Sequence, residues 1–158
     1  MHEPFFFRDF WMAGIAVNLV NALVLKFRSR SFIEQRPELA AGYAKLFYGV
    51  IFGGSLPWIV MGAGMVSGGV PSLISYFHPR DGNPFVIAFF AVVVLLWLLG
   101  FYWLFLRRGA EFIVEHPGLF QGNPKSPATI RAIYCLGVGG GVIAVLVICF
   151  TDFVPRLP

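Results

Sequence analysis

One short segment holds the residue types that could do acid–base or metal chemistry. It runs from position 107 to 116 and contributes Arg107, Arg108, Glu111, Glu115 and His116. On one continuous helix Glu111 lies four residues from both Arg107 and Glu115, the spacing of surface ion pairs. Neither an HExxH pattern nor paired cysteines complete a zinc ligand set. We therefore predict no metal site and no catalytic residue, and we expect a surface ion pair. An interfacial enzyme acting on a lipophilic substrate through these residues is an alternative.

Two asparagines form the most polar stripe within the apolar parts of the chain. Asn18 and Asn21 lie three residues apart, so a helix places them on one face. Pro57 lies in the next apolar stretch, where its missing N–H leaves the carbonyl of Gly53 without its usual donor and predicts a kink. We expect the asparagines to reach a neighbouring helix, with the Gly53 carbonyl as one acceptor. The alternative is a polar path, which would make the protein a small oligomeric channel or transporter.

Small residues recur at a spacing that favours close helix packing. Three glycine pairs lie four residues apart: Gly49 with Gly53, Gly64 with Gly68, and Gly137 with Gly141. In lipid such spacing lets two helix backbones approach closely and is a main route to tight association. We expect these glycines to pack within the chain, and association between chains is the alternative.

The apolar segments that position these residues are too extensive for a water-soluble domain of this size. Of 158 residues, 58% are hydrophobic and only 13% are charged, whereas soluble domains devote about a quarter of their residues to charge. The predicted fold class is all-α, a four-helix transmembrane bundle forming a single domain over residues 1–158. A span needs about 20 apolar residues, and the expected spans are about 5–26, 45–69, 84–106 and 129–151.

Proline marks the predicted helix starts. A residue followed by proline precedes each of the four apolar segments: Glu3-Pro4, Arg36-Pro37, Asn83-Pro84 and Ser126-Pro127. Proline suits the first helical turn, where its missing N–H is not needed. The side chains of Asn83 and Ser126 are also suited to cap the third and fourth helices.

The basic residues predict an orientation. Nine of the twelve lysines and arginines flank two connections between segments, namely Lys26, Arg28, Arg30, Arg36 and Lys45 in the first and Arg107, Arg108, Lys125 and Arg131 in the second. The positive-inside rule places both connections in the cytoplasm and both termini outside, in a plasma or inner membrane. Because these charges form short clusters between apolar segments, nucleic acid is not an expected partner.

The third apolar segment is rich in aromatic residues and carries no charge. Its aromatic residues are Phe89, Phe90, Trp97, Phe101, Tyr102, Trp103 and Phe105. Lipid is the ordinary neighbour of such a helix, although a partner protein or a hydrophobic pigment could also cover it; no cofactor is predicted. We predict a non-catalytic polytopic membrane protein, an accessory or structural subunit of a larger membrane assembly or a self-associating bundle. Its expected partners are membrane lipids and other membrane protein subunits or copies of itself.

Overall fold

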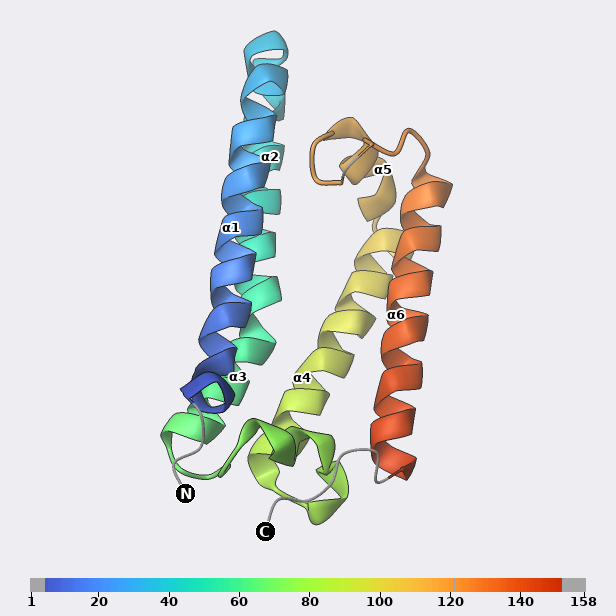
Figure 1. The fold of residues 1–158 in the computed structure, drawn as a ribbon. Helices are drawn as coiled ribbons and strands as arrows, with labels where there is room; N and C mark the ends of the chain where they lie inside the picture. The colour runs from blue at the N-terminus through green and yellow to red at the C-terminus, as the bar shows by residue number, and fades with distance from the viewer. Residues whose placement is uncertain (1–4, 121, 152–158) are drawn as a thin grey trace.

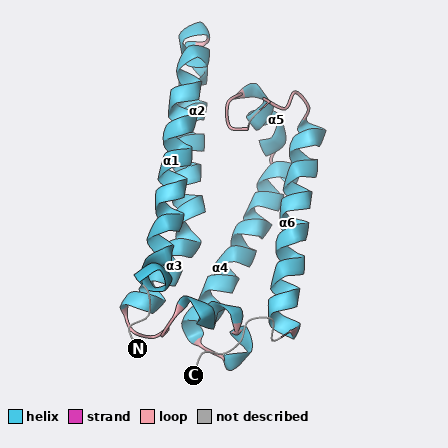
Figure 2. Cartoon of the chain, in the orientation of Figure 1, coloured by secondary structure: helices cyan, strands magenta, loops and turns pink. Residues whose placement is uncertain are grey.

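The part of the chain that the structure describes is built of helices and their connections. The computed structural model describes residues 5–120 and 122–151, and these contain helices and connections but no strand (Figures 1 and 2). Four helical segments are long and apolar enough to cross a membrane: residues 9–35, 37–66, 84–106 and 127–150. The predicted all-helical class and the four long apolar helices are confirmed.

The first two long segments form a hairpin that is longer than the expected spans. Helix α1 covers Phe5–Gln35, and a return rod follows after Arg36, made of η1 (Pro37–Leu39), α2 (Ala40–Tyr48), the π-helical turn η2 (Gly49–Gly53) and α3 (Gly54–Val66). At about 1.5 Å per residue, the 31 residues of α1 cover about 46 Å, against about 30 Å for a hydrocarbon core. Neither glycine nor proline interrupts residues 26–36, so the helix continues through the charged segment.

The predicted caps and helix starts are present where the structure describes them. Helix α4 (Pro84–Phe101) begins with the Asn83 side chain accepting hydrogen bonds from two backbone amides of the first turn. Helix α6 (Pro127–Phe150) begins with the Ser126 hydroxyl, which accepts a hydrogen bond from the backbone amide of Ala128. Prolines occupy the first turn of η1, α4 and α6. The proposed start at Pro4 lies outside the described residues.

Short helices join the two halves of the molecule. Between α3 and α4 lie η3 (Leu73–Phe77) and η4 (Pro79–Asp81), and α4 continues into the π-helical turn η5 (Tyr102–Leu106), after which comes α5 (Gly109–Glu115). The return rod ends at Val66 because Gly68 adopts a left-handed backbone with φ of 72°. Asn83 secures this turn by donating to the Gly69 carbonyl at 2.7 Å.

Two helical hairpins lie side by side, α1 with α2 and α3, and α4 with α6 (Figure 1). Helix α1 begins and α6 ends at one end of the molecule, while the α1–α2 connection and α5 lie at the other, here called the basic end. A core at the basic end joins both hairpins through Leu25, Leu39, Tyr43, Leu46, Leu104, Ala110, Ile113 and Ile130. A second core, of Met61, Met65, Val70, Tyr76 and Val86, joins α3 to α4 at the opposite end.

Candidate functional site

The segment with the chemistry-bearing residues is not one continuous helix. Arg107 and Arg108 separate η5 from α5, and Arg108 adopts a left-handed backbone with φ of 57°. The expected ion pair between Glu111 and Arg107 is therefore not formed. Glu111 instead accepts a hydrogen bond from Arg131 at 2.7 Å, and Arg107 donates to the hydroxyl of Tyr102 at 3.2 Å.

The surroundings of Glu111 favour its ionised form. A backbone hydrogen bond is the first cause that lowers the pKa of Glu111; partial burial opposes it, and the hydrogen bond and charge of Arg131 and the charge of Arg108 add to it. Arg131 also donates to the Leu104 carbonyl at 3.3 Å, so it ties the start of α6 to the end of η5. The ionised carboxylate thus joins α5 to α6.

His116 is a packing residue. Its ring is buried, stacks on Phe112 with centroids 4.2 Å apart, and meets Tyr43 edge-on at 5.1 Å. The Nδ1 atom lies 2.8 Å from the Phe112 carbonyl. A Cβ atom added to Gly42 would overlap the imidazole, so only glycine fits on the facing turn of α2. No group of three or more metal-ligating side chains occurs in the described part of the chain.

Hydrogen bonds from side chains of the first hairpin to backbone carbonyls hold α5 and the loop after it in place. The Tyr43 hydroxyl donates to the Pro117 carbonyl at 2.8 Å, and Arg36 donates to the Glu115 carbonyl at 3.3 Å. The Glu115 side chain itself is exposed. The α5 segment is therefore a structural bridge between the two hairpins at the basic end.

The two asparagines have different surroundings. The Asn18 amide donates to the Gly14 carbonyl at 3.0 Å within α1 and to the Gly54 carbonyl at 2.8 Å on α3. The interhelical acceptor is thus one residue beyond the Gly53 carbonyl that the sequence suggested, next to the π-helical turn that precedes Pro57. Asn21 is exposed and lines a cleft between the first hairpin and the loop that follows α5. Asn18 therefore joins α1 to α3, whereas the Asn21 side chain is open to the cleft.

The six glycines of the three predicted pairs also differ in their surroundings. A Cβ added at Gly64 would lie 2.8 Å from the Tyr76 hydroxyl, and one at Gly141 would lie 2.5 Å from Trp97. A Cβ added at any of the other four would have open space within 4 Å: Gly49, Gly53, Gly68 and Gly137.

Two close glycine–tryptophan contacts between α1 and α3 were not anticipated from the sequence. Gly14 faces the indole of Trp58, and Gly62 faces that of Trp11, at 2.6 Å for an added Cβ. Since each contact pairs one glycine with one aromatic ring, a search for glycines four residues apart does not find it.

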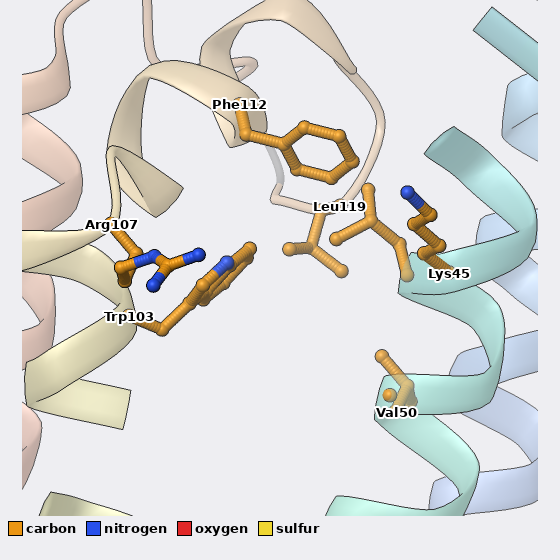
Figure 3. Close-up of a pocket in the computed structure, with 8 residues that line it drawn as sticks. Lys45, Val50, Trp103, Arg107, Phe112 and Leu119 are labelled. Carbon is orange, nitrogen blue, oxygen red and sulfur yellow. The ribbon is translucent and has the colours of Figure 1, made fainter. Parts of the chain in front are cut away.

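An open cleft separates the hairpins beneath the α5 segment. One half has a volume of about 600 Å³ and is lined by Lys45, Leu46, Gly49, Val50, Trp103, Arg107, Phe112 and Leu119 (Figure 3). The other half, of about 570 Å³, is lined by Asn21, Val24, Leu25, Arg28, Val50, Gly118, Leu119 and Phe120. Val50 and Leu119 line both halves, so they stand at the junction. We call the whole the interhairpin cleft.

The cleft wall at η5 is shaped by the break after the π-helical turn. Gly109 packs on the Trp103 indole, where an added Cβ would lie 2.5 Å from the ring, and Phe112 meets the same indole edge-on at 6.1 Å. In Figure 3 Arg107 extends beside Trp103, while Lys45 and Val50 lie on the opposite wall. The cleft therefore has an apolar lining with a cation on each side.

Fold and site together define an all-helical protein with four helices long and apolar enough to span a membrane. Comparison of the chain with known protein families, with curated proteins and with solved structures gives no match.

Proposed function

We propose that this protein crosses a membrane four times and works without catalysis, through helix packing, as a subunit of a larger membrane assembly or as a self-associating bundle. The helices expose large apolar side chains along their length, such as Leu98 at 63%, Leu136 at 77% and Phe150 at 76%. In water such a surface would drive aggregation, whereas lipid tails or another apolar helix would cover it at no cost.

One observation carries the packing function. Helix α6 turns Gly137 and Gly140 to open space, and both added Cβ positions have no neighbour within 4 Å. Ala144, exposed, continues the same face at i, i+3, i+7 spacing. Gly141, by contrast, is covered by Trp97 of α4. A small, open helix face of this kind lets a further transmembrane helix approach closely.

The chemistry-bearing residues support the same proposal. Glu111 is paired with Arg131, His116 is buried against Tyr43, and Asn18 bridges α1 and α3. Each of these three side chains makes a contact that holds two helices together, so packing accounts for its position. Packing therefore explains these residues better than either alternative.

Association is tested by purifying the protein in mild detergent and measuring its mass and its copurifying subunits. Gly137→Leu combined with Gly140→Leu is expected to dissociate the assembly, because the added side chains hold the partner helix away. Ala132→Leu, also at an exposed position of α6, is the matched control and should leave it intact. A lone monomer without copurifying protein, unchanged in mass by the glycine variants, would contradict the proposal.

We further propose that the basic end faces the cytoplasm and both termini lie outside, in a plasma or inner membrane. The support is the excess of lysine and arginine on the two connections at that end. A topology reporter fused to the C-terminus should respond only from the non-cytoplasmic side. A response from the cytoplasm alone would reverse the orientation.

A further inference from the structure

We propose that the interhairpin cleft binds an anionic amphiphile, with its charged group between Lys45 and Arg107 and its hydrocarbon chain along the apolar lining. The proposal uses a different part of the molecule from the open face of α6. It rests on the proposed membrane residence only in that a membrane supplies such molecules.

The charges favour an anion. Lys45 and Arg107 are both exposed and line the same half of the cleft from opposite hairpins (Figure 3). Arg107 has uncharged contacts, a hydrogen bond to the Tyr102 hydroxyl and a cation–π contact at 5.9 Å with the same ring. Within residues 5–120 and 122–151 neither cation has a carboxylate partner. Arg28 adds a third cation at the other half.

The lining favours a hydrocarbon chain. Apart from the two cations and Gly49, this half is lined by Leu46, Val50, Trp103, Phe112 and Leu119. A volume of about 600 Å³ for this half is within the range of about 300–1,000 Å³ that is usual for small-molecule sites. Val50 and Leu119 line both halves, and the second half extends along Asn21, Val24 and Arg28 of α1.

The absence of a side chain at Gly49 keeps the cleft wide. Gly49 lines the cleft, and an added Cβ would have no neighbour within 4 Å. Its backbone is helical, with φ of −60° and ψ of −42°, so a larger residue fits the helix. Gly49→Leu is thus a variant that fills the site without altering charge.

The experiment is native mass spectrometry of the purified full chain in detergent micelles. The probes, each added in a separate arm, are dioleoylphosphatidylglycerol, oleic acid and, as the neutral reference, dioleoylphosphatidylcholine. The wild type is expected to retain one anionic probe in preference to phosphatidylcholine. The arm with the stronger retention identifies the source, a membrane phospholipid or a free fatty acid, and either source supports the site.

The variants decide whether the cleft is responsible. Lys45→Gln with Arg107→Gln should weaken the affinity for the anionic probe by roughly 5- to 30-fold, the effect expected from two interfacial cations. Arg30→Gln with Lys125→Gln removes the same charges at exposed positions outside the cleft and should have little effect. Gly49→Leu should reduce retention although the charges remain.

Equal losses in the two double variants would show surface attraction alone and overturn the proposal. Retention of both anionic probes at the phosphatidylcholine level would also overturn it. Since the readout is a bound probe on a monomer or an assembly alike, failure here leaves the packing function standing. Failure of the α6 test likewise leaves the cleft standing.

Discussion

Replacing Asn18 with leucine should weaken the packing of α1 against α3 and destabilise the protein. The Asn18 amide makes two hydrogen bonds, of which only the 2.8 Å bond to the Gly54 carbonyl joins the helices. The bond to the Gly14 carbonyl lies within α1, so it can also form when α1 is not packed on α3, and it adds nothing to their association. An interhelical hydrogen bond between apolar helices contributes about 0.6–2 kcal/mol, so the unfolding equilibrium constant should rise roughly 3- to 30-fold.

The assay is unfolding of the purified protein in mixed micelles, followed by far-ultraviolet circular dichroism and by thermal denaturation. Asn21→Leu is the matched control, because Asn21 is exposed on the same helix and has no side-chain hydrogen bond within the described residues. The same loss in both variants would attribute the effect to added hydrophobicity. No loss in Asn18→Leu would refute the inference that this bond holds the hairpin.

A double-mutant cycle localises the effect. A Cβ added at Gly54 would lie 2.5 Å from the side-chain oxygen Oδ1 of Asn18, so Gly54→Ala should destabilise the wild type. In an Asn18→Ala background the obstacle is gone, and the same change should cost much less. Additive losses would mean that the two residues do not meet in solution.

Three further outcomes are expected. Gly64→Ala should destabilise the protein by about 1–3 kcal/mol because its Cβ would enter a filled space. Gly53→Ala should instead stabilise it by about 0.4–1 kcal/mol, because Gly53 is helical and an added Cβ has open space around it. Thermal denaturation in detergent measures both changes, and stability changes of the same sign would contradict this prediction. Tyr43→Phe removes the 2.8 Å bond to the α5 loop and should cost about 1 kcal/mol, seen as faster amide exchange in residues 109–120; unchanged exchange argues against the bridge. Glu111 has a pKa below its ordinary value, so its contribution is present above the unfolded pKa and is lost as the pH falls through the folded pKa. Acid titration of stability should therefore be flatter in Glu111→Gln than in the wild type, and identical curves for the two proteins would contradict the pairing.

The sequence predicts the fold class well because the governing signals are local. Apolar runs of membrane length, with few charges, identify four helices whatever their tertiary arrangement. The first turns are equally local, and the caps at Asn83 and Ser126 form as expected. Helix ends are less local: residues 26–35 lack a breaker, and the helix continues through charges that mark the end of an apolar run but do not end a helix.

The site was harder to predict because its contacts depend on tertiary structure. Helical spacing brings Glu111 near Arg107 only when the helix is continuous, and the left-handed conformation of Arg108 ends that continuity. Arginine carries no sequence signal for φ above zero, unlike glycine or asparagine. The actual partner, Arg131, comes from the next helix, and no periodicity within one segment could have indicated it.

The same break explains why a cleft exists at the basic end. A straight continuation of α4 would carry residues 109–115 away from the first hairpin, leaving its apolar face uncovered. The turn at Arg108 instead directs α5 across the molecule, where Ile113 enters the core with Leu39 and Leu46. At the opposite end α3 and α4 pack directly through Met61, Met65, Val70, Tyr76 and Val86. Because a folded-back segment and not a second direct helix contact joins the hairpins at the basic end, space remains beneath α5, bounded by a cation on either side.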